Sequence, residues 1–413
     1  MSRSWKKRRW LVLFVLVAVP LSGLVIRPAG SRASSEDLRR LLQATAPPPA
    51  AACGPALCLG GPEFMAALQQ DLASARQRVL VQTLSFEGDL AGSTLVQALI
   101  DSPAPEKLLI IDAYSLFVQS DKFVGSPPRL LDFPLYGEAC RMRDLVDTLR
   151  REGVQVRFGR PFGLGRDNLA ARDHKKICVV DDVVYLGGIN FSDHNFLWHD
   201  LMFRSEDPAA AASLAADFRS SWRGCSGDTT VQCASMELVI GSGAGRPTIA
   251  RRLAAAIAGA RHSIYLECPY ITEPFFELLG RARRRGVRVT VVTSEHINRL
   301  GMKWNIMQGC ADHDLDLRLM KGRMTHVKAM LVDDRRLVLG SANFDFLSGS
   351  LQPELLAVTE DPEVIGQFNA RIKEPSLAGS RQWTAREQGH PLGAVGRGIM
   401  AVARKVLAGV HER

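Results

Sequence analysis

The chain has 413 residues, of which 46% are hydrophobic and 23% are charged, and its formal net charge at pH 7 is +9. This composition excludes a disordered chain and leaves room for two or three ordinary domains. The positive charge favours an anionic partner, but charge alone does not distinguish nucleic acid from an acidic membrane.

The N-terminus carries four basic residues, 6–9, followed by an apolar run of 17 residues from Trp10 to Ile26. Positive charge before an apolar run is typical of a signal peptide or an uncleaved signal anchor. No clear cleavage site follows at once, so we expect residues 1–27 to be an anchor, with a cleaved and secreted form as the alternative. The positive-inside rule then places the rest of the chain on the periplasmic or extracytoplasmic side.

Residues 28–58 are expected to be a linker. The eight cysteines suit an oxidising compartment, and two pairs are close enough in sequence to close small loops: Cys53 with Cys58, and Cys225 with Cys233. No cysteine spacing resembles a zinc site, so neither a metal nor a cofactor is predicted.

An internal repeat is the strongest organisational signal in the chain. Apolar residues at helical spacing run from Phe64 to Ala75 and lead into the apolar run 79–81. The same pattern returns 185 positions later, from Ile249 to Ala260, and leads into the run 264–266. Each unit predicts an amphipathic helix that feeds a buried strand.

Both units continue with a second helix, expected to end at Gly153 in the first and at Gly286 in the second, and with further β-rich runs. The apolar run 108–111 precedes that helix in the first unit only. We therefore expect the order of elements to differ between the two halves.

Strands that alternate with helices predict layered α/β lobes, and the repeat predicts two such lobes related by a pseudo-two-fold axis. We place lobe 1 at 59–235, lobe 2 at 236–375 and a basic tail at 376–413, in which 394–410 could form an amphipathic helix. Lobe 1 carries 33 more residues than lobe 2, and we place most of them between Tyr114 and Arg141. A long insertion in a compact lobe is usually functional or mobile.

Both halves contain His-x-Lys followed by four residues and Asp, then a glycine pair or Gly-Ser, an Asn and an acid. The first copy comprises His174, Lys176, Asp181, Gly188, Asn190 and Asp200. The second comprises His326, Lys328, Asp333, Ser341, Asn343 and Glu354. One copy alone would be a weak signal, but two copies inside an independent repeat make coincidence a poor explanation.

The spacing has a structural meaning. Residues i and i+2 lie on one face of a strand, so each histidine points the same way as its lysine. Asp181 and Asp333 lie at an odd spacing from their histidines, and each begins an acidic turn. We therefore interpret both mainly as turn residues, although they belong to the motif.

These residue types suit phosphoryl chemistry. A histidine can attack phosphorus, the lysines can hold the non-bridging oxygens, and the asparagines can add hydrogen bonds. Asp200 and Glu354 are the carboxylates expected to fix the imidazole tautomers. The other histidine can act as the acid and base, and the set requires no metal.

The motifs resemble those of the phospholipase D superfamily, over roughly residues 60–370, and within it the cardiolipin synthase branch. Runs 173–177 and 187–190 are similar to the first motif of that branch, and 198–200 resembles its Trp-Arg-Asp. Phe218 and Trp222 match its Phe-x-x-x-Trp helix, and Pro269-Tyr270 resembles its Pro-Tyr-Phe region.

The resemblance implies a bilobal α/β/α fold with one active site at the lobe interface and a phosphohistidine intermediate. By analogy, His174 is the nucleophile and His326 the acid and base. Leu347-Ser348 stands in place of the usual Arg-Ser, and Gln352 in place of the usual Asn. These departures and the insertion leave the acceptor alcohol open.

Four functions follow. The first is a membrane phosphatidyltransferase that acts on an anionic phospholipid similar to phosphatidylglycerol, and the second is a phospholipase D that uses water as acceptor. A nuclease ranks lower, and no nucleic-acid partner is expected, because no platform of aromatic and basic residues stands out. Both complete motifs argue against a binding protein without activity. The oligomeric state stays open.

Overall fold

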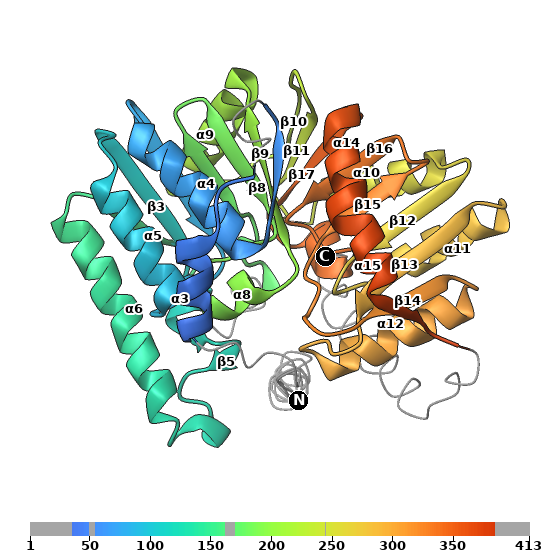
Figure 1. Ribbon diagram of the computed structural model, residues 1–413, viewed down its shortest axis with the longest axis horizontal. Helices are drawn as coiled ribbons and strands as arrows, with labels where there is room; N and C mark the ends of the chain where they lie inside the picture. The colour runs from blue at the N-terminus through green and yellow to red at the C-terminus, as the bar shows by residue number, and fades with distance from the viewer. Residues whose placement is uncertain (1–34, 49–53, 162–169, 244, 385–413) are drawn as a thin grey trace, which may run out of the picture.

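The computed structural model describes residues 35–48, 54–161, 170–243 and 245–384. Figure 1 shows two α/β lobes side by side, each built on one large sheet. The strands of the first sheet are β1 (Ala56–Leu59), β2 (Arg78–Thr83), β3 (Glu106–Asp112), β6 (Gln155–Gly159), β7 (Ile177–Val180), β8 (Val183–Gly187) and β9 (Leu201–Glu206). Its helices are α3 (Ser35–Ala44), α4 (Gly60–Ser74), α5 (Leu90–Asp101), α6 (Phe133–Arg151), α8 (Asp193–Leu197) and α9 (Pro208–Trp222).

The second lobe repeats this plan. Its strands are β10 (Thr229–Gln232), β11 (Glu237–Gly241), β12 (Ser263–Glu267), β13 (Arg288–Ser294), β14 (Asp316–Met320), β15 (Ala329–Val332), β16 (Arg336–Gly340), β17 (Glu354–Thr359) and β18 (Ser380–Gln382). Its helices are α10 (Thr248–Gly259), α11 (Phe275–Arg284), α12 (Leu300–Asp312), α13 (Phe346–Ser350), α14 (Pro362–Phe368), a π-helical turn (Asn369–Lys373) and α15 (Glu374–Ala378). The expected pair of α/β lobes is therefore confirmed.

The two sheets have the same strand order. The first runs β1-β9-β8-β7-β2-β3-β6, and the second runs β11-β17-β16-β15-β12-β13-β14 with β10 and β18 added at its edges. In both sheets three parallel strands, β2-β3-β6 and β12-β13-β14, join an antiparallel set. The expectation that the order of elements differs between the halves is wrong.

The two halves were aligned wrongly because the sequence pattern did not reveal helix α5. Helices do end just before Gly153 and Gly286, both at positive φ, but they are not equivalent. The partner of α11 is α5, and the partner of α12 is α6. The first turns of α5 contain Gly92 and two β-hydroxy residues, which are weak helix formers. The Asp89 side chain starts this helix by accepting the Gly92 N–H at 3.0 Å.

The lobe boundaries also differ from the expected ones. Residues 35–44, expected within a linker, form α3, whose buried Leu38 joins the core of lobe 1. Strand β10 belongs to the second sheet although it precedes residue 236, and β18 extends that sheet beyond residue 375. Such short edge strands have too few residues to show the alternation of apolar and polar side chains that identifies a strand in a sequence.

The extra residues of lobe 1 lie largely where they were expected. Residues 113–132, here called the insertion, connect β3 to α6, whereas residues 295–299 make the equivalent connection in lobe 2. The insertion contains a 3₁₀ turn (Ala113–Leu116), a small hairpin of β4 (Val118–Gln119) and β5 (Lys122–Phe123), and a second turn (Pro127–Arg129).

The lobes share one buried apolar core. Strand β8 lies against β16 and β17 across the boundary, and side chains such as Leu186 and Leu339 belong to the same cluster. Each lobe has a second core between its sheet and its outer helices. Removing this much apolar surface from water holds the two lobes in a fixed relation.

The two terminal segments lie outside the described residues, and one of the two disulfides considered does not form. Residues 1–27 and 394–410 lie outside the described part of the chain, and none of the helices within that part is long and apolar enough to cross a membrane. Cys225 and Cys233 are free thiols, so they do not form the disulfide considered for them. Cys58 is also free and buried, whereas Cys53 lies outside the described residues.

The side chains of Asp181 and Asp333 bind the backbone at the starts of β2 and β12. The Asp181 carboxylate accepts the N–H groups of Arg76, Gln77 and Arg78 at 2.7–2.9 Å. Asp333 accepts those of Arg261, His262 and Ser263 in the same way at 2.7–2.9 Å. Both have positive φ in the turn after their strand, so their interpretation as turn residues is confirmed.

We expect Asp181→Asn to lower the free energy of unfolding by about 1–2 kcal/mol, because an amide accepts fewer of these hydrogen bonds and carries no charge. Burial raises the pKa of Asp181, but the three backbone N–H groups outweigh it and lower the pKa below its ordinary value of 3.8. The difference in free energy of unfolding between the wild type and the variant should therefore be largest above pH 4 and disappear as the pH falls below 3.8.

Urea unfolding at several pH values measures this difference. The matched control is Asp182→Asn, since Asp182 is exposed and makes only a 4.0 Å ion pair. Equal stability of the two variants at pH 7 would contradict the turn role.

Candidate active site

The two histidines lie between the lobes, at equivalent places in the two sheets. His174 comes three residues before β7, and His326 three residues before β15. Both strands run antiparallel to the parallel set, so their first residues pair with the carboxyl ends of β2 and β12. The carboxyl ends of parallel strands are the usual location of α/β active sites.

The backbone of each histidine is held by the other lobe. The His174 N–H donates to the Pro353 carbonyl at 3.0 Å, and the His326 N–H donates to the His199 carbonyl at 2.7 Å. Pro353 and His199 each precede the motif acid of their own lobe. Each lobe therefore provides the backbone carbonyl that binds the motif histidine of the other lobe.

The carboxylates contact the histidines in the same crossed way. Nδ1 of His174 lies 2.8 Å from Oε1 of Glu354, and Nδ1 of His326 lies 2.6 Å from Oδ2 of Asp200. Ser341 donates its hydroxyl to Glu354, and its carbonyl oxygen lies 3.1 Å from the same His174 nitrogen. The sequence left the pairing of acids and histidines open, and the structure pairs each histidine with the acid of the opposite lobe.

This pairing fixes the tautomers. A carboxylate at Nδ1 favours the proton on that nitrogen and leaves the Nε2 lone pair available. Burial lowers the pKa of His174 and outweighs the opposing effect of Glu354. Burial and the Lys328 charge lower the pKa of His326 to about 3. Both rings are therefore neutral at pH 7, as a nucleophile must be.

The lysines lie against the histidines they accompany. Nζ of Lys176 donates to the His174 carbonyl at 2.7 Å, and Lys328 donates to the His326 carbonyl. Lys328 also lies 3.7 Å from Asp200. Burial lowers the pKa of both lysines, that of Lys176 to about 7. An anion in the site would restore their charge, so the pair is suited to hold phosphoryl oxygens.

The asparagines hold the loops around the site. Oδ1 of Asn190 accepts the Ser85 N–H at 3.2 Å, and its amide donates to Asn195 at 3.1 Å. Oδ1 of Asn343 accepts from the Cys268 thiol at 3.9 Å, as Oδ1 of Asn190 accepts from the Thr83 hydroxyl at 3.5 Å. A direct contact of either amide with substrate stays a prediction. Asp181 and Asp333 lie at the far ends of β7 and β15, so the structure does not bring them to the site.

Two rings lie beside His326 and a third packs behind one of them, and the sequence indicated no role for any of the three. The Trp198 ring centroid lies 4.9 Å from that of His326, and the Tyr270 centroid lies 6.3 Å from it. His194 in turn packs edge-on against Trp198 at 4.9 Å. Trp198 and Tyr270 occurred in the recognised motifs, whereas His194 has Leu347 as its counterpart in the repeat and gave no signal.

An acidic cluster lies next to His194. Glu87, Asp89 and Glu138 bring carboxylate oxygens within 4.8 Å of one another, and this is the group among the described residues that could hold a cation. Its acids already have partners, because Asp89 accepts two backbone N–H groups and Glu138 accepts the Ser120 hydroxyl. Burial lowers the pKa of His194, but Glu87 and Asp121 raise it to about 10, so its ring is charged and offsets part of the cluster.

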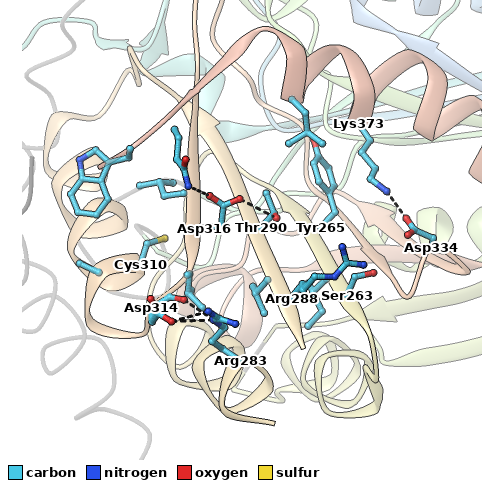
Figure 2. Close-up of a pocket in the computed structure, with 18 residues that line it drawn as sticks. Ser263, Tyr265, Arg283, Arg288, Thr290, Cys310, Asp314, Asp316, Asp334 and Lys373 are labelled. Atoms are coloured by element: carbon cyan, nitrogen blue, oxygen red, sulfur yellow. Dashed lines mark hydrogen bonds and ion pairs between the residues drawn. The ribbon is translucent and has the colours of Figure 1, made fainter. Parts of the chain in front are cut away.

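A separate cavity of about 650 Å³ lies in lobe 2 at the opposite, amino ends of β12, β13 and β14. Figure 2 shows two ion pairs among the side chains that line it, Lys373 with Asp334 and Arg283 with Asp314. None of the motif residues lines it. The cavity and the histidines are therefore separate features of the structure.

Comparison with known proteins gives a consistent set of relatives. A family model described as cardiolipin synthase, PLD-like domain, matches residues 68–222 and 253–375. Cardiolipin synthase A of Erwinia tasmaniensis is 27% identical over 276 residues, which cover 60% of this chain and 55% of that protein. Cardiolipin synthase A of Yersinia pseudotuberculosis is 26% identical over 273 residues, which cover 58% of this chain and 55% of that protein. The chain thus spans about half the length of the curated relatives it matches.

Solved structures share the fold. The phosphatidylserine synthase of Haemophilus influenzae superposes with a TM-score of 0.66 at 12% identity, covering 91% of this chain and 99% of that chain. Polyphosphate kinase from Porphyromonas gingivalis superposes with a TM-score of 0.53 at 10% identity, covering 84% of this chain and 53% of that chain. At these identities the likeness shows the two-lobed architecture alone.

The lysines should give the site a characteristic pH dependence. Because the pKa of Lys176 is lowered to about 7, its charge is lost as the pH rises through that value. We therefore expect kcat/KM for a soluble aryl phosphodiester to fall with rising pH between about 7 and 9. Lys176→Arg should be slower but should lose this alkaline fall, since a guanidinium stays charged. A flat wild-type profile from pH 6 to 9 would contradict this role for Lys176.

Proposed function

The chain belongs to the cardiolipin synthase, phospholipase D-like domain family, and on that premise we propose that it is a phosphatidyltransferase with a phosphohistidine intermediate. One observation carries the proposal: two buried neutral imidazoles, each held at Nδ1 by a carboxylate of the opposite lobe, at 2.8 and 2.6 Å. This arrangement frees both Nε2 atoms for a single phosphorus centre between the lobes.

The first step breaks the bond between phosphorus and the leaving alcohol. Nε2 of His174 attacks phosphorus and forms a phosphorus–nitrogen bond, while the imidazolium of His326 gives its proton to the departing oxygen. The charge of the bound phosphodiester raises the pKa of His326 from its low value in the free site, which makes that proton available. Lys176 and Lys328 hold the non-bridging oxygens, where negative charge must be stabilised.

The second step returns the enzyme to its starting state. An alcohol attacks phosphorus, His326 takes the proton of its hydroxyl, and the phosphorus–nitrogen bond to His174 breaks. Trp198 and Tyr270, 7% and 8% exposed, flank His326 and limit the access of water to the base. That shielding favours transfer to an alcohol over hydrolysis.

The names of the relatives suggest the substrate class. Cardiolipin synthase A and phosphatidylserine synthase both point to a phosphatidyl donor, and the chain's net charge of +9 suits an anionic donor similar to phosphatidylglycerol. We further propose that residues 1–27 attach the enzyme to a membrane, with the lobes on the extracytoplasmic side. The N-terminal mass of the mature protein distinguishes this anchor from a cleaved signal peptide.

The test is product analysis with labelled phosphatidylglycerol and full-length, detergent-solubilised protein, with and without added alcohols. We expect cardiolipin and glycerol. Phosphatidic acid alone would identify a hydrolase. No lipid turnover together with cleavage of DNA would overturn the proposal.

Substitution of the histidines tests the mechanism within the same assay. His174→Ala and His326→Ala should each lower turnover by at least about 10³-fold, because each ring is needed in both steps. His262→Ala is the matched control, since this exposed histidine lies at the amino end of β12, away from the site. Full activity in either of the first two variants would contradict a shared site.

A further inference from the structure

The exposed apolar side chains of the described chain are concentrated at the insertion. Phe117, Leu130, Leu131 and Phe133 are 42%, 59%, 81% and 72% exposed, and only Leu41, at 44%, is a large exposed hydrophobic residue elsewhere in that part. We call these four residues the apolar edge. Single exposed apolar residues are ordinary, but a contiguous group of them marks an interaction surface.

The apolar edge is held in place by polar contacts beneath it. The Asp132 carboxylate accepts the Leu135 N–H at 3.4 Å at the start of α6 and pairs with Lys122 and Arg129 at 3.5 and 3.6 Å. The Val124 N–H donates to the Phe117 carbonyl at 2.8 Å. The fold therefore presents these side chains outward.

The insertion also forms part of the rim of the active site. Asp121, in its hairpin, lies 3.6 Å from His194 and accepts the Asn298 amide at 3.1 Å. Asn298 accepts the Tyr270 hydroxyl at 2.6 Å, and His194 packs against Trp198. The rings of Trp198 and Tyr270 both lie beside the His326 ring. The hairpin beside the apolar edge is thus connected through these contacts to the His326 ring.

The chain enters the described structure at the same place. The Ser35 hydroxyl donates to Asp193 at 3.2 Å in α8, one residue before His194. Residues 27–34 connect Ser35 to the apolar run 10–26 and can span at most about 28 Å. If that run is in a bilayer, the bilayer lies close to α8 and to the insertion.

We infer that the apolar edge docks into the surface of an anionic phospholipid bilayer and thereby turns the mouth of the active site toward the lipid head groups. The inference rests on the proposed function for its partner, a membrane that contains the substrate. The exposed leucines and phenylalanines enter the acyl boundary.

The kinetic test uses full-length Leu131→Asp/Phe133→Asp and two forms of phosphatidylglycerol. We expect turnover of lipid in vesicles to fall by at least about 10-fold, because charged residues oppose insertion, while turnover of short-chain monomeric lipid stays within about twofold. Ala209→Asp is the matched control. It adds charge at an exposed position on α9, which Figure 1 places at the opposite end of lobe 1 from β5. Equal losses on both substrates, or no loss on vesicles, would overturn the inference.

A second measurement needs no turnover. An environment-sensitive fluorescent amino acid in place of Leu131 should shift to the blue on addition of phosphatidylglycerol vesicles and be quenched by brominated acyl chains. Quenching without any lipid turnover would support docking while the proposed function fails. Turnover without quenching would overturn docking alone. A blue shift that depends on protein concentration in the absence of vesicles would identify a second copy of the chain as the partner and overturn the inference.

Discussion

The structure depends on a crossed pairing, in which a carboxylate of each lobe contacts the motif histidine of the other lobe. Asp200 of lobe 1 holds His326 at 2.6 Å, and Glu354 of lobe 2 holds His174 at 2.8 Å. All four side chains are buried. A lobe on its own would keep a buried carboxylate without its partner, which is costly, and a histidine without its orienting group. The shared apolar core that fixes the lobes is therefore also what completes the site.

Burial decides the electrostatics of the site. Removing these groups from water lowers the pKa of both histidines and both lysines, while the carboxylates stay ionised because the charges around them outweigh the effect of burial. The site thus holds neutral imidazoles and lysines whose pKa is lowered. In the proposed reaction, the negative charge of a bound phosphodiester would raise the pKa of the lysines and of His326. Substrate binding would in this way also bring these groups to the protonation states that the reaction requires.

Part of this could be predicted from sequence, and the failures have physical causes. The repeated motif singled out the histidines, the lysines and the two acids by their recurrence in both halves, although the histidines and lysines precede β7 and β15 and do not lie on a strand as expected. Spacing within one half says nothing of the other half, so the crossed pairing stayed open. Helix α5 was missed because weak helix formers fill its first turns, and its absence led to a wrong alignment of the halves. Trp198, Tyr270 and most of the apolar edge come from loops, where no periodicity marks the positions, and His194 and Phe133 lie in a very short helix and at a helix start.

The most direct test of the crossed pairing is ¹⁵N NMR of the full-length protein labelled at its nine histidines. At pH 7, His174 and His326 should each show a protonated Nδ1 and an unprotonated Nε2. Glu354→Gln should shift the resonances of His174 and leave those of His326, and Asp200→Asn should do the reverse. If each substitution instead changed the histidine of its own lobe, or if both rings were cationic in the free enzyme, the shared site described here would be contradicted.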